Sequence, residues 1–176
     1  MSRSSSRRAC LRAAALALLG VVGLAGCQPQ KAPPEPAPRK PPRASLVLRV
    51  RAAPDLNPND RGEPTPVDVR VYQLDDRVAF TEAAFEELWT SAERLGASSL
   101  VDPKVLSFEP QPADAAPSAH ELKLDPRAQF IGIMALYAAE RREGLEERKL
   151  CVSVDEAAMK IVVLSGHSVR LVDPTE

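Results

Sequence analysis

Hydrophobic and polar residues alternate along two early segments of the chain. In Ser45–Arg51, Leu46, Leu48 and Val50 share one face, and arginines occupy the other. Val67–Leu74 repeats this pattern, with valines against polar residues. Strict alternation places every second side chain on the same side of an extended backbone, so both segments are predicted to be half-buried β-strands.

Six later segments also have the length and composition of strands. They are Lys104–Phe108, His120–Leu124, Gln129–Tyr137, Lys149–Val154, Met159–Leu164 and Ser168–Val172. Gln129–Tyr137 is apolar on both faces, which predicts a strand in the interior of a sheet. About eight short strands separated by turn residues predict a mainly β domain, built as a β-sandwich.

A different periodicity interrupts the strands after residue 80. Apolar residues recur there at steps of three and four, as on one face of a helix. They are Phe85, Leu88, Trp89, Ala92 and Leu95. Thr81 is suited to cap the start of this helix and Gly96 to end it. We expect one amphipathic helix, docked on the sandwich by this stripe.

The first 26 residues have the organisation of a signal peptide. Four arginines and no acidic residue precede an apolar run, Ala13–Gly23, which is shorter than the ~20 residues that span a membrane. Leu24-Ala25-Gly26-Cys27 follows and resembles the lipobox of bacterial lipoproteins at every position. The resemblance implies cleavage before Cys27 and lipidation of Cys27; the alternative is a generic signal peptide with an accidental cysteine.

Two features near this signal bear on the route and the destination of the chain. Arg7-Arg8 resembles the twin-arginine export signal, so both that route and general secretion remain open. Gln28 stands where lipoproteins retained in the inner membrane carry aspartate, which implies delivery to the outer membrane.

Residues 27–43 contain seven prolines from Gln28 onward and predict an extended tether of up to about 50 Å. The alternative is a proline-rich ligand for a recognition domain.

Cysteine content and charge limit what the remaining chain, residues 44–176, can do. Cys10 leaves with the signal and Cys27 carries lipid, so Cys151 has no partner for an intramolecular disulfide. We expect Cys151 to be a buried structural thiol; the alternative is a nucleophile. Without the four signal arginines the chain has 19 basic and 24 acidic side chains, a net charge of −5. This balance argues against nucleic acid or anionic lipid as partners.

The segment between the first two strands is unusually long for a strand connection. Irregular loops of more than ~12–15 residues are uncommon and often functional. Four prolines restrict this one, which lowers the entropy that a partner must remove on binding. The loop is therefore a candidate binding surface; the alternative is a solvated loop stiffened against proteolysis.

Several runs in their order resemble one family. They are Leu48–Pro58, Pro64–Leu74, Phe80–Trp89, Leu95-Gly96 and Asp125–Ala135. With the lipobox and tether, they resemble the TssJ family, the outer-membrane lipoproteins of the type VI secretion system. The resemblance implies a transthyretin-like β-sandwich with an added helix, and a lipid-anchored domain facing the periplasm.

The resemblance also implies a partner and a site. TssJ lipoproteins bind the periplasmic C-terminal domain of the inner-membrane protein TssM, and TssL completes the membrane complex. Contact is made by the loop that joins the first two strands, with a leucine expected to be exposed for burial by the partner. In this chain the implied residues are Pro54, Asp55, Leu56, Asn57, Pro58, Asn59, Asp60, Arg61, Gly62, Glu63 and Pro64.

Nothing in the sequence has the spacing of a catalytic or metal-binding motif. The two histidines, His120 and His167, have no second ligand at metal-binding distance, and H-E-x-x-H, C-x-x-C and G-x-S-x-G are absent. We expect no enzyme activity, metal, cofactor or small-molecule substrate, although a dispersed Ser-His-Asp triad would leave no sequence pattern. The alternative function is a lipoprotein adaptor or inhibitor of another envelope machine.

Overall fold

A computed structural model describes residues 43–137 and 145–175 of the chain. The signal peptide, Cys27 and nearly all of the tether lie outside these residues. Within them, no helix is long and apolar enough to cross a membrane.

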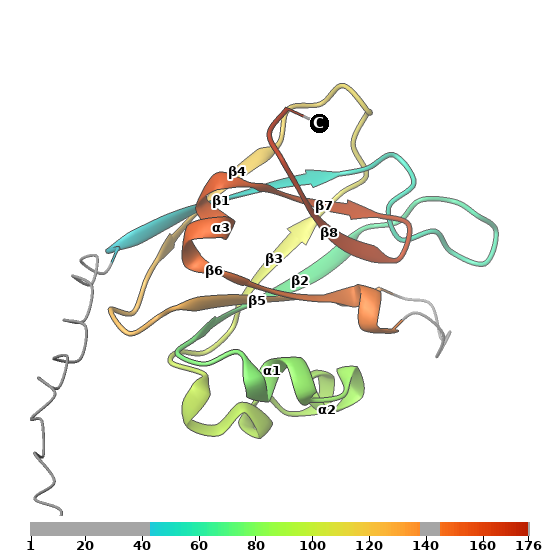
Figure 1. The fold of residues 1–176 in the computed structure, drawn as a ribbon. Helices are drawn as coiled ribbons and strands as arrows, with labels where there is room; N and C mark the ends of the chain where they lie inside the picture. The colour runs from blue at the N-terminus through green and yellow to red at the C-terminus, as the bar shows by residue number, and fades with distance from the viewer. Residues whose placement is uncertain (1–42, 138–144, 176) are drawn as a thin grey trace, which may run out of the picture. The chain divides into compact units, whose positions relative to one another are not determined.

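The described residues form two four-stranded sheets (Figure 1). Sheet A has the order β4 (Ser118–Lys123), β1 (Ser45–Ala52), β7 (Ile161–Ser165) and β8 (Ser168–Val172). Sheet B has the order β3 (Lys104–Phe108), β2 (Val67–Leu74), β5 (Phe130–Ala135) and β6 (Lys149–Ser153). All neighbours pair antiparallel except β1 and β7, which pair parallel. The prediction of an eight-stranded, mainly β sandwich is confirmed.

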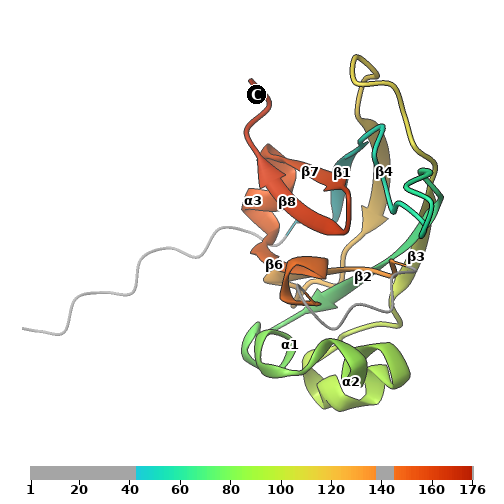
Figure 2. The ribbon, with the colours of Figure 1, turned by 90° about the vertical axis from the view of Figure 1, so that its right-hand side faces the viewer.

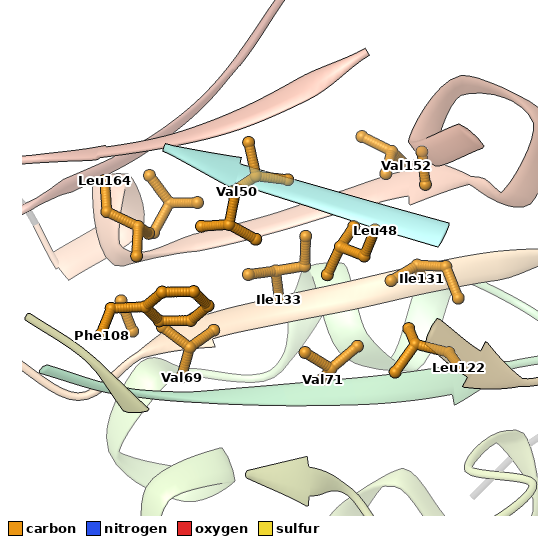
Figure 3. Close-up of a cluster of buried hydrophobic side chains, with 14 of the residues drawn as sticks. Leu48, Val50, Val69, Val71, Phe108, Leu122, Ile131, Ile133, Val152 and Leu164 are labelled. Atoms are coloured by element: carbon orange, nitrogen blue, oxygen red, sulfur yellow. The ribbon is translucent and has the colours of Figure 1, made fainter. Parts of the chain in front are cut away.

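The core lies between the two sheets, where the alternating residues of both meet (Figure 3). Leu48 and Val50 of β1 are buried against Val69 and Val71 of β2, as the alternation predicted. β5 is an interior strand, and all its residues after Phe130 are buried, which confirms the expectation for this segment.

A second, smaller core lies on the outer side of sheet B, under a layer of short helices (Figure 2). This layer consists of α1 (Val78–Glu82), α2 (Phe85–Thr90) and the 3₁₀ segment η1 (Ala92–Ser98). Met134 and Tyr72 point into it from sheet B, and Phe80, Leu88 and Leu95 from the helices. The sandwich therefore has one face covered by helices, and the helical face is that of sheet B.

The prediction of a single helix from Thr81 to Gly96 is wrong. Thr81 lies inside α1, where its hydroxyl donates to the carbonyl of Arg77 at 2.9 Å. The chain is extended at Ala84, which begins α2, and the Glu87 carboxylate accepts from the N–H of Ala84 at 3.1 Å. That local cap begins a new helix where the apolar spacing alone indicates a continuous one.

Two further details of the helix prediction differ. Trp89 is 42 % exposed, so it lies at the edge of the helical core and not in the buried stripe. Gly96 has φ 51° and ψ −132° inside η1, so it bends the segment before it ends.

A helix that the alternation did not predict, α3 (Val154–Met159), joins the two sheets. Ser153 caps it by accepting from the N–H of Glu156 at 3.2 Å, and the Glu156 carboxylate approaches the N–H of Ser153 in return. Serine followed by glutamate three residues later is a capping box, a signal present in the sequence. Because α3 extends to Met159, the following strand begins at Ile161 and not at Met159 as predicted.

Candidate functional site

The loop between β1 and β2 is anchored to the core by one residue. Leu56 has no exposed surface and belongs to the cluster between the sheets. Its carbonyl accepts from the N–H of Thr65 at 3.0 Å, which ties the two ends of the loop together. The expectation of an exposed leucine at this position is wrong, because the loop folds back and places Leu56 beneath its own surface.

Asn57 fixes the loop from inside. It is 3 % exposed and adopts φ 47°, a conformation that asparagine tolerates better than most residues. Its side-chain amide donates to Thr65 Oγ1 at 2.8 Å and to the carbonyl of Pro66 at 2.7 Å. The Thr65 hydroxyl donates back to the carbonyl of Asn57 at 2.6 Å. Asn57 therefore supports the loop from inside.

The outer part of the loop is a separate tight turn organised by Asn59. Its Oδ1 accepts from the N–H groups of Arg61 at 2.9 Å and Glu63 at 3.0 Å. Its Nδ2 donates to the Glu63 carboxylate at 2.9 Å, and Gly62 supplies a φ of 77°. One side chain thus holds four consecutive residues in a defined shape, although all of them are exposed.

The β7–β8 turn supports the loop from the side. The Ser165 hydroxyl donates to the carboxylate of Asp55 at 3.2 Å, and the N–H of Asn57 donates to the carbonyl of Gly166 at 2.8 Å. His167 Nε2 lies 3.2 Å from the carbonyl of Pro58. Since a carbonyl only accepts, Nε2 carries the proton in this contact. Residues 110 positions apart therefore form one structural unit.

Tyr137, two residues after the end of β5, completes this support. Its ring meets the His167 ring edge-on, with centroids 5.6 Å apart, and its hydroxyl donates to the carbonyl of Ser168 at 2.7 Å. Burial raises the pKa of Tyr137, so the hydroxyl remains a donor across the physiological range. The sequence indicated the turn around His167 but gave no sign that it supports the loop, because the contact exists only between distant strands.

The supported loop presents a defined set of exposed side chains, which we call the loop tip. Nine of the predicted contact residues are exposed or partly exposed, whereas Leu56 and Asn57 are buried. The loop tip consists of Pro54, Asp55, Pro58, Asn59, Asp60, Arg61, Gly62, Glu63 and Pro64. This arrangement is suited to binding a partner surface through a polar rim on a rigid base.

The described residues contain one serine–histidine contact, and its geometry does not activate the serine. Ser118 Oγ lies 3.0 Å from His120 Nε2 and 3.1 Å from the carbonyl of Val50. The carbonyl can only accept, so the hydroxyl hydrogen points to Val50 and the imidazole donates to the oxygen. Burial, with Lys104 as the second cause, also lowers the pKa of His120. In residues 43–137 and 145–175, no three metal-ligating side chains come together.

Cys151 is half-buried on the helical side of β6, less enclosed than expected. Burial raises its pKa to about 11, which keeps the thiol protonated and weakly nucleophilic at neutral pH. This environment fits a packing role better than a nucleophilic one.

Comparison with known proteins gives a consistent result. The family model described as type VI secretion lipoprotein, VasD, EvfM, TssJ, VC_A0113 matches residues 44–165. A search of curated proteins gives no match.

Among solved structures, the T6SS lipoprotein TssJ1 from Pseudomonas aeruginosa is 24 % identical, with a TM-score of 0.61, over 76 % of this chain and 97 % of that one. A chain of a type VI membrane complex is 26 % identical, with a TM-score of 0.62, over 73 % and 98 %. A structure of the T6SS protein TssM C-terminal domain (869–1107) from EAEC matches at 24 % identity, with a TM-score of 0.60, over 73 % and 97 %.

These matches cover the described sandwich, and they confirm the resemblance seen in the sequence. The family model spans more than half of the chain, from the start of β1 to the end of β7. The chain belongs to the type VI secretion lipoprotein family that includes TssJ and VasD.

Proposed function

We propose that this lipoprotein is anchored in the outer membrane through Cys27 and binds the periplasmic C-terminal domain of a TssM-like inner-membrane protein. A TssL-like protein joins the same complex indirectly. The family match and the likeness to a chain of a type VI membrane complex support this role. The function is that of a structural subunit, without catalysis.

The set of hydrogen bonds that holds the loop tip is the observation that supports the proposal. A loop already held in one shape loses little conformational entropy when a partner binds. Leu56 holds the loop tip from the core, Asn57 from within the loop, and Ser165 and His167 from the neighbouring turn. The Asn59–Glu63 turn is ordered by the Asn59 side chain although it is exposed, which is suited to recognition of a partner.

We assign the contact with the partner to fewer residues than the eleven that the family resemblance implied. In the described part of the chain, the side chains of Asp60 and Arg61 make no hydrogen bond or ion pair within the domain, and the two residues lie between Asn59 and Gly62 in the turn. We assign the central contacts to these two residues, with Pro58 and Pro64 as apolar flanks. Leu56 and Asn57 contribute by holding the loop in shape.

The test is calorimetric titration of the unacylated chain, from residue 28 onward, into the periplasmic domain of the TssM-like partner. The loop variant is Asp60→Lys with Arg61→Glu, which keeps the net charge and every hydrogen bond that orders the loop. The matched control is Arg77→Glu with Asp102→Lys, two exposed residues at the opposite end of the sandwich. We expect the parent and control to bind equally and the loop variant to lose at least about tenfold in affinity.

Each outcome has a clear meaning. Equal binding by the loop variant would keep the partner and move the site elsewhere. Absence of binding by the parent would contradict the assignment to TssM and leave the adaptor or inhibitor role.

The proposed outer-membrane location is tested separately. Envelope fractionation should place the wild-type chain with outer-membrane vesicles and Gln28→Asp with inner-membrane vesicles. Cys27→Ser should release the chain from both. Wild-type protein in the inner-membrane fraction would contradict the proposed location.

A further inference from the structure

The outer face of sheet A brings together arginines that are far apart in the sequence. Arg49 and Arg51 are two residues apart on β1, so their side chains share one face. Arg51 pairs with Val163 of β7, and Val163 pairs with Arg170 of β8, which puts Arg170 in the same row and on the same face. The alternate residues of these strands face the core. We call this surface, with Arg49, Arg51 and Arg170, the arginine face.

In the described part of the chain no ion pair joins these arginines to an acidic side chain, although Glu121, which pairs with Val47, lies on the same face. Arg49 donates to the carbonyl of Met159 at 2.6 Å and makes no ion pair. Arg51 Nε is shielded from solvent and has no hydrogen-bond partner among the protein atoms. Arg170 is exposed. Guanidinium groups that are not engaged in an ion pair can bind an anion.

Apolar side chains lie beside the arginine face. Val47, on the same side of β1, is 49 % exposed, and Met159, next to the Arg49 contact, is 58 % exposed. Sheet B, in contrast, has its outer face covered by α1, α2 and η1 (Figures 1 and 2). The arginine face therefore offers both cationic and apolar groups on a surface that the helical layer leaves open.

We propose that the arginine face docks on anionic phospholipids of the membrane that carries the chain's anchor. Arginine pairs with phosphate oxygens through two parallel hydrogen bonds, and exposed apolar side chains enter the headgroup region. β1 is the first strand after the tether, so a lipid anchor at Cys27 limits the distance between this face and the bilayer to the length of the tether. A surface with both kinds of group is suited to the headgroup layer of an anionic membrane.

The net charge of −5 argues against binding to anionic lipid, but this value is a sum over the whole surface of the domain. Charge acts over about 8–10 Å at physiological ionic strength, so the local arrangement decides. The loop tip lies beyond the end of β1 and not on the arginine face, so lipid docking leaves it free for a protein partner (Figure 1).

The test uses co-sedimentation of the unacylated chain, from residue 28 onward, with lipid vesicles. One set is pure phosphatidylcholine; in the other, about a third of the lipid is phosphatidylglycerol. The face variant is Arg49→Gln with Arg51→Gln and Arg170→Gln. The matched control, Arg61→Gln with Arg77→Gln and Lys104→Gln, changes the net charge equally on other surfaces. We expect parent and control to prefer anionic vesicles by at least about tenfold, and the face variant to lose that preference.

A second measurement keeps the three arginines, so its result does not depend on whether the face variant folds. An environment-sensitive dye on Met159→Cys, in a Cys151→Ser background, should shift to the blue on anionic vesicles. The same dye on Glu82→Cys, on the helical side, should not shift.

Three results would overturn the proposal. The parent could bind both vesicles equally, or the control could lose as much binding as the face variant, which would make the effect one of net charge. The face variant could also bind vesicles like the parent while losing affinity for the TssM-like domain, which would make this face a protein contact. Because the vesicle assay contains no partner protein, its failure is separate from failure of the proposed function.

Discussion

Replacing Asn57 by alanine is the most direct test of how the loop is held. The change removes the hydrogen bonds that the Asn57 amide donates to Thr65 Oγ1 at 2.8 Å and to the Pro66 carbonyl at 2.7 Å, in a residue that is 3 % exposed. Each is worth about 1 kcal/mol, and the Pro66 carbonyl is left partly buried without this donor. Alanine at φ 47° adds about 1 kcal/mol of backbone strain. The expected loss in free energy of unfolding is therefore about 3 kcal/mol.

The control is Asn59→Ala, in the same loop. The Asn59 side chain makes three hydrogen bonds with described residues, but all of its partners are exposed and water can replace it. Its loss should cost only about 1 kcal/mol. Urea denaturation followed by circular dichroism gives both values by linear extrapolation. If Asn59→Ala destabilises the domain as much as Asn57→Ala, the argument from burial is refuted.

Three further predictions concern the core and the thiol. Leu56→Ala should destabilise the domain by about 3 kcal/mol in urea denaturation, because it leaves a cavity between the sheets; a loss under about 1 kcal/mol would contradict its burial. Gly132→Ala should lower the melting temperature, because its Cβ would lie 2.8 Å from the Phe80 ring. If the double variant Gly132→Ala with Phe80→Leu regains the melting temperature, the clash with Phe80 is identified as the cause. An unchanged melting temperature in Gly132→Ala would refute the clash. Alkylation of Cys151 by iodoacetamide should be slow at pH 8 and accelerate toward about pH 11, and a plateau by pH 9 would contradict the raised pKa.

Local patterns in the sequence were sufficient to predict the strands. Alternation in β1 and β2 correctly assigned which residues face the core, because side chains of a strand alternate by geometry alone. The two-sided apolar character of β5 correctly predicted an interior strand. Both inferences depend on properties of a single segment.

In the helical region, the spacing of apolar residues did not predict where the helices begin and end. The stripe of apolar residues was read as one helix, but the cap at Ala84 divides it, and a capping box at Ser153 begins a helix in a segment assigned to strands. The capping box at Ser153 could have been recognised in the sequence. The start at Ala84 could not, because alanine carries no capping group and only the Glu87 carboxylate defines it.

The sequence by itself determined the number and the facing of the strands, the position of the long loop, and the family to which the chain belongs. Only the tertiary structure decided that Leu56 is buried, that Asn57 is a support, and that Arg170 joins the arginines of β1. The physical reason is distance along the chain. Burial in a loop and the gathering of charge on a sheet face depend on β7 and β8, more than 100 residues away, whereas strand alternation is settled between neighbours.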